Sequence, residues 1–219
     1  MSSFAWGSGM SKDEQFKQAY ALQMQEKHDT ISASTARATD SRGTVMVLTG
    51  QGKGKTSAAF GMVYRSLGHG LRCGVVQFIK GNHISGEVTF LQHLGFLGSG
   101  HMAQVDYHSM ATGVIWEKHD WDLHKQAADV AWHEALRMMS DPSLDLVVLD
   151  ELMPMFTYGY LGLDQVLQAL EQRLNHQTVV MTGRHAPSAL TLVADTISEI
   201  ADIKHAFKAG VKAQAGIDF

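Results

Sequence analysis

The pattern of apolar positions along this chain predicts strands that alternate with helices. Helical spacing of apolar residues predicts one helix at residues 55–67 and another at residues 163–174. Continuous apolar strands that alternate with helices are typical of a parallel sheet covered on both faces. We therefore expect an α/β fold with a doubly wound, mostly parallel sheet. Short runs rich in β-branched residues predict its strands at residues 44–49, 73–79, 144–149 and 177–182.

A helical extension is expected ahead of the α/β region. Residues 11–27 are polar, lack Gly and Pro, and place Phe16, Tyr20 and Met24 four residues apart on one stripe. Such an amphipathic helix either packs on its own core or reaches a partner subunit, and the pattern leaves both open. Residues 30–42, rich in Ser, Thr and Ala, are expected to form a linker or a weak helix. The expected units are an N-terminal extension, 1–42, and an α/β domain, 43–219.

Composition and charge narrow the class of protein. A chain of 219 residues that is 45% apolar can bury a full core, and its net charge of −4 argues against a protein that coats nucleic acid. The opening ten residues lack a basic stretch followed by an apolar core, and no segment approaches a membrane-spanning length, so we expect a cytoplasmic protein without a membrane partner. The single cysteine, Cys73, lies in an apolar run and is expected to be a buried structural thiol.

The stretch LTGQGKGKTSAAFG, residues 48–61, predicts a phosphate-binding loop between a strand and a helix. The usual pattern G-x-x-x-x-G-K-[ST] requires glycine at position 49, where this chain has Thr49. A glycine-rich turn at a helix N-terminus offers backbone N–H groups to an anion, and the lysine that follows adds a cation. A turn that binds nothing and a dinucleotide fold are the alternatives, but the latter needs G-x-G-x-x-G. The expected nucleotide-binding residues are Gly50, Gln51, Gly52, Lys53, Gly54, Lys55, Thr56 and Ser57.

A pair of carboxylates completes a candidate magnesium site. Asp150 and Glu151 follow the apolar run at residues 144–149, where ligands bind in α/β sheets, although such a pair can also cap a turn. Spacing does not decide which carboxylate faces the ion, whose other expected protein ligand is the hydroxyl of Thr56. A GTPase usually has an N-K-x-D segment, and the chain contains no Asn-Lys pair. A motor or recombination ATPase and a kinase or other transferase remain open on these motifs.

Six separate blocks together resemble one family. Besides the loop they are VVQFIKG at 75–81, MATG at 110–113 with Trp116, VVLDEL at 147–152, TGR at 182–184, and the tail from KHAF at 204–207 to Phe219. In this order they resemble the ATP:cob(I)alamin adenosyltransferases of the corrinoid-salvage type, from about Gly43 onward. The resemblance implies a P-loop fold whose shortened loop holds ATP in the reverse sense, with the ribose 5′ carbon open to attack.

The resemblance also implies the reaction and its participants. The cobalt(I) of a reduced cobalamin or cobinamide attacks the 5′ carbon, and triphosphate leaves with Mg²⁺ held by Thr56 and by Glu151 rather than Asp150. No general base is needed, because cobalt(I) carries no proton. An electron donor such as a flavodoxin or flavin reductase is expected. The resemblance also implies a homodimer with an exchanged N-terminal helix, which favours the interpretation of residues 11–27 as an arm that reaches the partner subunit. The expected catalytic residues are Lys55 and Trp116.

Two positions depart from the family pattern. In the family, apolar side chains beneath the corrin displace the lower axial ligand and make cobalt(II) easier to reduce, and Trp116 and Val114 occupy the matching segment. Phenylalanine is typical where this chain has Val114, so a gap is expected there. Asparagine is common where it has Gln51, whose extra methylene shifts any hydrogen bond to the nucleotide. The alternative role for Trp116 is packing alone.

The remaining candidates have a functional and a structural interpretation each. Arg184, after a strand, either clamps the phosphates or is a solvated side chain. His119, His124 and His133 lack zinc spacing and are expected at the surface or in packing. Core packing is expected for Met138 and Met139.

Two functions compete with adenosyl transfer. One is an ATP-hydrolysing P-loop protein with another acceptor, and the other is a corrinoid-binding delivery module.

Overall fold

The computed structural model describes residues 10–79, 85–110 and 120–218. The chain divides into two compact units, residues 1–41 and 42–219. In the first unit, α1 (Lys12–Arg37) begins at Ser11, which exchanges hydrogen bonds with Glu14 in a capping box. The helix continues past residue 27, where we predicted its end, to Arg37. None of its residues is buried, and its apolar side chains Phe16, Tyr20, Leu22 and Ile31 are exposed.

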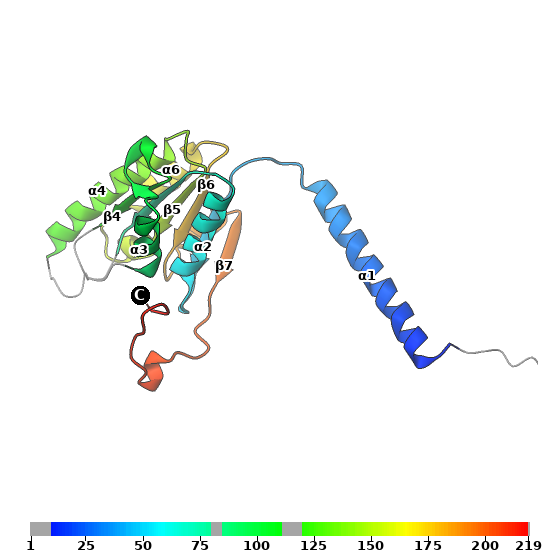
Figure 1. Cartoon of the computed structure of the whole chain (residues 1–219). Coiled ribbons are helices and arrows are strands. Elements are labelled where there is room, and N and C mark those ends of the chain that lie inside the picture. Colours follow the sequence, from blue (N-terminus) through cyan, green and yellow to red (C-terminus); the bar gives the residue numbers. More distant parts are fainter. Residues whose placement is uncertain (1–9, 80–84, 111–119, 219) are drawn as a thin grey trace, which may run out of the picture. The chain divides into compact units, whose positions relative to one another are not determined.

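In the second unit, seven described strands form one parallel sheet in the order β3-β4-β2-β5-β6-β1-β7 (Figure 1). The expectation of a mostly parallel sheet is therefore confirmed. Because all strands run the same way, their carboxyl ends share one edge. The strands are β1 (Val45–Thr49), β2 (Cys73–Gln77), β3 (Leu97–Gly98), β4 (Val105–Ser109), β5 (Leu146–Asp150), β6 (Thr178–Thr182) and β7 (Thr196–Glu199).

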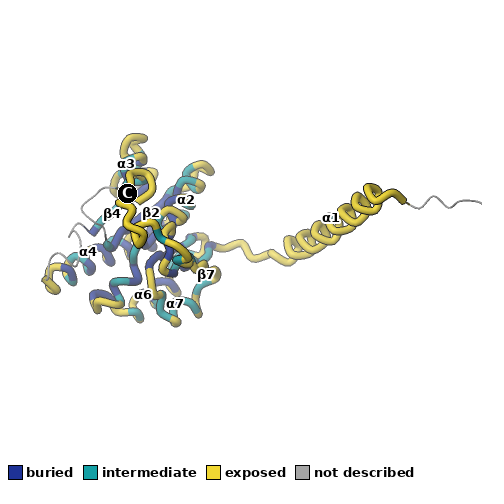
Figure 2. Tube along the Cα trace, turned by 90° about the horizontal axis from the view of Figure 1, so that it is seen from below, coloured by how far each residue is buried: buried dark blue, intermediate teal, exposed yellow. Residues whose placement is uncertain are grey.

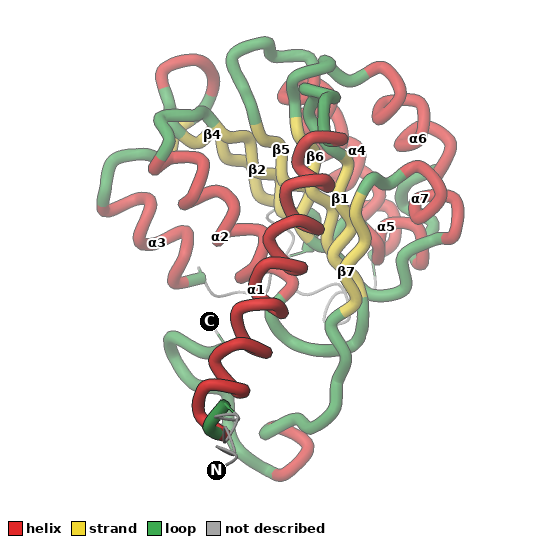
Figure 3. Tube along the Cα trace, turned by 90° about the vertical axis from the view of Figure 1, so that its right-hand side faces the viewer, coloured by secondary structure: helices red, strands yellow, loops and turns green. Residues whose placement is uncertain are grey.

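Helices cover both faces of the sheet (Figure 3). Apolar residues of α2 and α3 pack in one buried cluster, and those of α4, α5, α6 and α7 pack in another on the opposite face. The helices are α2 (Lys55–Gly68), α3 (Gly86–His93), α4 (Trp121–Met139), α5 (Met153–Thr157), α6 (Leu163–Gln172) and α7 (Ser188–Val193), with short 3₁₀ turns at Gly100–Met102 and Phe207–Ala209.

The central strand β5 shows why its sequence is apolar throughout. Val148 belongs to the cluster under α2 and α3, whereas Val147 and Leu149 belong to the cluster on the other face. Side chains of a strand alternate between faces, so a strand covered on both sides needs apolar residues at every position. Figure 2 shows the buried strands inside and the exposed chain near the C-terminus. Each buried Val or Leu contributes about 1.5–3 kcal/mol to folding.

The predicted elements of the α/β region are confirmed, with ends shifted by at most two residues. Cys73 is fully buried, and burial raises the pKa of its thiol to about 12, as expected for a structural thiol. Met138 and Met139 lie in the core, and His124 is buried against Tyr160, so these packing predictions are confirmed as well. Among the helices in the described part of the chain, none is both long and apolar enough to cross a membrane.

Candidate functional site

The predicted phosphate loop connects β1 to α2 at the carboxyl edge of the sheet. Gly50 and Gly54 have positive φ angles, 99° and 114°, which favour glycine. Gly52 is constrained by contact instead. Its N–H donates a hydrogen bond of 2.7 Å to the carbonyl of Ile200, and a Cβ there would lie 2.5 Å from the carbonyl oxygen of Ala201. The segment that follows β7 therefore lies directly against the loop, and glycine is required for this close approach.

Thr49 occupies the position where a common phosphate loop has glycine. Its carbonyl accepts a hydrogen bond of 2.9 Å from the N–H of Ile200. Its hydroxyl accepts one of 3.3 Å from the N–H of Ala186, which follows β6. Thr49 thus joins the start of the loop to both of the segments that leave the sheet beside it.

Lys55 lies inside the curve of the loop. Its side chain is buried, and Nζ donates hydrogen bonds to the carbonyls of Gly50 (2.9 Å) and Gly52 (2.8 Å). Burial lowers the pKa of Lys55 because it disfavours the ammonium, while the nearby charge of Glu151 opposes this shift. The loop therefore holds a cation at its centre with the carbonyls directed at it.

Asp150, at the end of β5, contacts the loop helix rather than solvent. Its carboxylate accepts hydrogen bonds from the hydroxyls of Thr56 (3.0 Å) and Thr182 (2.7 Å) and from the amide of Gln77 (2.9 Å). Burial raises the pKa of Asp150, and these hydrogen bonds oppose the increase. A carboxylate engaged by three donors serves here to orient its partners.

Glu151 joins this network through its backbone, whereas the residue also lines a cavity over the loop. Its φ of 52° is unusual for a non-glycine residue, and its N–H donates a hydrogen bond of 2.9 Å to the hydroxyl of Thr182. Burial and the adjacent Asp150 raise the pKa of Glu151, whereas Lys55 and Arg184 lower it. The left-handed turn places the two neighbouring carboxylates in different surroundings, one in the hydrogen-bond network and the other at a cavity.

That cavity, of about 800 Å³, lies over the loop. Cations of the loop face it together with Arg184, and the C-terminal segment forms part of its wall. Its lining residues are Gly52, Lys53, Gly54, Lys55, Thr56, Ser57, Tyr64, Ser85, Gly86, Glu87, Phe90, Glu151, Arg184, Gly216, Ile217 and Asp218. The lining carries three cations and also three carboxylates, Glu87, Glu151 and Asp218. The volume suits a ligand of nucleotide size.

Two side chains of the loop contact distant parts of the chain. Lys53 forms an ion pair of 2.5 Å with Asp218 in the C-terminal segment. The Gln51 amide nitrogen lies 3.1 Å from Nε2 of His185, just after Arg184. The loop is thus tied by its side chains to the two segments that border the cavity.

Most of the predicted site residues meet at this edge of the sheet. Two do not belong to the described part of the chain, since Val114 and Trp116 fall within residues 111–119. Sequence reasoning assigned no role to Gln77 and Thr182, which contact Asp150. The signal for Gln77 was present, because it is a polar residue inside an apolar run. Its partner was not evident, because that depends on which strands are neighbours.

The oxygen donors at the cavity fit a magnesium ion. Thr56 supplies a hydroxyl and Glu151 a carboxylate, and Mg²⁺ is commonly held by one or two carboxylates with phosphates and water completing its shell. Among the described residues, no three His, Cys, Asp or Glu side chains gather as a metal cluster. The hydroxyl of Thr56 and the carboxylate of Glu151 are therefore suited to an ion that arrives with a nucleotide.

Comparison with known proteins gives consistent matches. The family model described as ATP:corrinoid adenosyltransferase BtuR/CobO/CobP matches residues 41–219. "Corrinoid adenosyltransferase CobA" of Salmonella typhimurium is 46% identical over 200 residues, which cover 91% of this chain and 97% of that protein. "Corrinoid adenosyltransferase" of Escherichia coli K12 is 45% identical with the same coverage. The Pseudomonas aeruginosa protein of that name is 42% identical over 210 residues, 96% of this chain and all of that one.

Proposed function

Because the chain belongs to the ATP:corrinoid adenosyltransferase family, we propose that it transfers the 5′-deoxyadenosyl group of ATP to the cobalt of a reduced corrinoid, cobalamin or cobinamide. The carbon–oxygen bond at the ribose 5′ carbon breaks, a cobalt–carbon bond forms, and triphosphate leaves. The observation that carries this proposal is the cavity of nucleotide size over a phosphate loop in which Thr49 replaces the usual glycine.

The loop and its neighbours bind the triphosphate in this proposal. Displacement at the 5′ carbon develops negative charge on an oxygen of the α-phosphate, so cations and N–H groups placed beforehand lower the barrier. Lys55, Lys53 and Arg184 line the cavity and supply the charge. The amides of residues 53–57 supply hydrogen bonds, whereas the N–H of Gly52 donates to Ile200. The side chain of Gln51, which lies beside His185, is a further proposed contact of the nucleotide. The described part of the site needs no base, because cobalt(I) carries no proton to remove.

ATP lies in the reverse sense to that of P-loop hydrolases, with its 5′ carbon open to the corrinoid. This orientation is proposed from the family to which the chain belongs. In this structure the Ile200 and Ala201 backbones fill the space next to Gly50 and Gly52. Thr49 adds a link from the loop to Ala186. The conformation of the loop is therefore fixed by its contacts with the segments that follow β6 and β7.

Thr56 and Glu151 hold the magnesium ion that accompanies ATP. Bound there, the ion would neutralise charge on the triphosphate as it leaves. Replacing Thr56 with valine removes the hydroxyl at nearly constant volume, so it should weaken binding of Mg·ATP about tenfold, whereas Thr56→Ser keeps the hydroxyl and should bind normally. Calorimetry on both variants checks this. Equal binding by Thr56→Val and the wild type would exclude Thr56 as a ligand.

The corrinoid binds next to this site. Trp116 and Val114 are its proposed contacts, and in the sequence they follow β4, which ends at Ser109 on the carboxyl edge of the sheet. Trp116 keeps the lower face of the corrin apolar, so that cobalt(II) lacks its lower ligand and is reduced more easily. A flavodoxin or a flavin reductase supplies the electron.

The protein acts as a homodimer in the cytoplasm, where ATP is available. The exposed apolar side chains of α1, which has no buried residue, support its role as an arm that packs on the partner subunit. Residues 43–219 then form the catalytic domain. Sedimentation with and without residues 1–41 tests this, because loss of the helix should shift the dimer towards monomer. A truncated protein that stays fully dimeric would exclude the arm.

An anaerobic assay tests the central proposal. The purified protein receives Mg·ATP and chemically reduced cobalamin, while the visible spectrum and the phosphate products are followed together. Light-sensitive adenosylcobalamin with an equal amount of triphosphate is the expected result. The control omits the corrinoid, and ADP with phosphate in that sample would instead establish an ATP hydrolase.

A further inference from the structure

A chain of polar side chains runs across the sheet beneath the nucleotide site, with Gln77 and Asp150 buried at its middle and Tyr107 and Thr56 part-buried at its ends. The hydroxyl of Tyr107 on β4 donates a hydrogen bond of 2.7 Å to the side-chain oxygen of Gln77 on β2. The amide nitrogen of Gln77 donates one of 2.9 Å to Asp150 on β5, and Asp150 accepts one of 3.0 Å from Thr56. The order β4-β2-β5 places these strands side by side, with Gln77 directly opposite Asp150.

The hydrogen bonds of this chain have a defined direction. An ionised carboxylate only accepts, so Asp150 needs the N–H₂ side of the Gln77 amide. The hydroxyl of Tyr107 occupies the other side of that amide as a donor, which fixes its orientation. Thr56 uses its single hydrogen on Asp150, and the lone pairs of its oxygen stay available to a cation in the cavity.

Packing alone does not account for Gln77. It is buried, as is Asp150, and its neighbours along β2 are apolar. A buried amide is tolerated only when its hydrogen bonds are made, and losing one leaves a buried partner unsatisfied. Both polar ends of the Gln77 amide are used, one by Tyr107 and the other by Asp150, so we explain the amide by what it holds in place.

We propose that Gln77 and Tyr107 are positioning residues that hold Asp150 where it accepts the hydrogen of Thr56, so that the hydroxyl oxygen of Thr56 faces the metal end of the nucleotide. This inference rests on the proposed Mg·ATP site. Neither residue touches the nucleotide, because neither lines the cavity as Thr56 and Glu151 do. Their effect is therefore specific to the magnesium-dependent part of binding.

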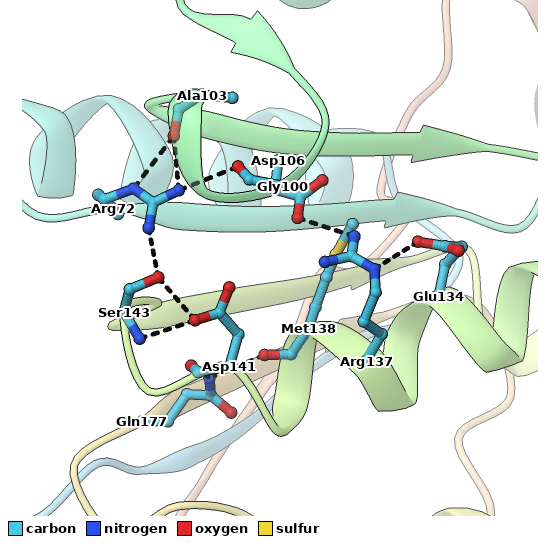
Figure 4. Close-up of polar contacts among 10 residues, drawn as sticks. All are labelled: Arg72, Gly100, Ala103, Asp106, Glu134, Arg137, Met138, Asp141, Ser143 and Gln177. Carbon is cyan, nitrogen blue, oxygen red and sulfur yellow. Dashed lines mark hydrogen bonds and ion pairs between the residues drawn. The ribbon is translucent and has the colours of Figure 1, made fainter.

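The experiment compares two glutamines that are both buried. Gln77→Met removes the amide beneath the site. Gln177→Met removes a similar one at the opposite end of the sheet. Gln177 donates there to the carbonyls of Met138 (3.1 Å) and Leu144 (3.0 Å). Figure 4 shows Gln177 beside Met138. Calorimetry measures ATP binding to each variant with magnesium and with EDTA. Thermal unfolding of each variant reports how much stability it has lost.

Gln77→Met should weaken Mg·ATP binding about tenfold and change metal-free ATP binding less than twofold. Tyr107→Phe, which removes one hydroxyl, should give the same pattern at about threefold. Gln177→Met should lower the unfolding temperature without changing the ratio of the two affinities. An unchanged ratio in Gln77→Met, or the same shift in Gln177→Met, would overturn the inference. A wild-type protein that fails to bind Mg·ATP would instead refute the proposed function.

Discussion

Replacing Gly52 with alanine tests whether the segment after β7 shapes the phosphate loop. The added Cβ would lie 2.5 Å from the carbonyl oxygen of Ala201 and 2.8 Å from that of Ile200, closer than real contacts allow. The two segments must then separate, and the 2.7 Å hydrogen bond from Gly52 to Ile200 is lost. Crowding of this kind costs about 1–3 kcal/mol and the hydrogen bond about 1 kcal/mol, so we expect about 2–4 kcal/mol of destabilisation.

Urea and thermal unfolding measure this cost, which corresponds to a fall in unfolding temperature of about 5–15 °C for a domain of this size. Gly54→Ala is the matched control. A Cβ at Gly54 meets nothing within 4 Å, so its cost, about 1–3 kcal/mol, comes only from the positive φ of 114°. Hydrogen exchange separates the two variants, because only Gly52→Ala should speed exchange at Ile200. Stability within about 0.5 kcal/mol of wild type, with unchanged exchange at Ile200, would refute the reasoning.

The other predictions concern the loop cations, an ion pair away from the site and the corrinoid segment. Lys55→Ala should abolish turnover and weaken ATP binding about a hundredfold, and calorimetry should show about tenfold weaker ATP binding for Lys53→Ala. Near-normal turnover of Lys55→Ala would exclude the assignment of residues 48–61 as a phosphate-binding loop. Asp195→Asn should cost about 1–2 kcal/mol at pH 7, because Arg42 binds the Asp195 carboxylate and lowers its pKa to about 2. That stabilisation is present above the pKa of Asp195 in the unfolded chain, near 4, and is lost as pH falls towards 2. Urea unfolding should therefore show the unfolding free energies of the variant and the wild type converging near pH 2. A constant difference would contradict the assignment of this stabilisation to the ionised Asp195. Trp116→Ala should keep ATP binding and impair the reaction that starts from cobalt(II), and an equal loss with prereduced cobalt(I) would rule out a role in reduction.

Local sequence was sufficient to predict the phosphate loop and the strands that bear it. The glycines, Lys55 and Thr56 are consecutive, and the apolar runs of β1, β2, β5 and β6 are continuous because both of their faces are buried. The strands β4 and β7 lack a continuous apolar run. β4, VDYHS, mixes polar with apolar residues, and β7, TISE, is an exposed edge strand of four residues. As an edge strand, β7 buries less surface, so its sequence is less constrained.

The contacts that complete the site could not be predicted because they join residues far apart in the chain. Gln77 and Thr182 meet at Asp150 only because β5 lies between β2 and β6. The crowding at Gly52 depends on residues 200–201, which local pattern does not connect to the loop. The order of strands in a sheet is a property of the whole domain, and the polar contacts follow from it.

The contact between the loop and residues 200–201 also bears on synthesis of the protein. β1 is made early but pairs with β6 and β7, the last strands of the sheet. A chain emerging from the ribosome therefore contains the complete motif from Gly50 to Thr56 long before the residues that shape it exist. Sheets closed by such distant pairings form late. Nascent chains that end before β7 should carry the nucleotide motif and yet fail to bind ATP, so that binding begins only when translation of the domain is nearly finished.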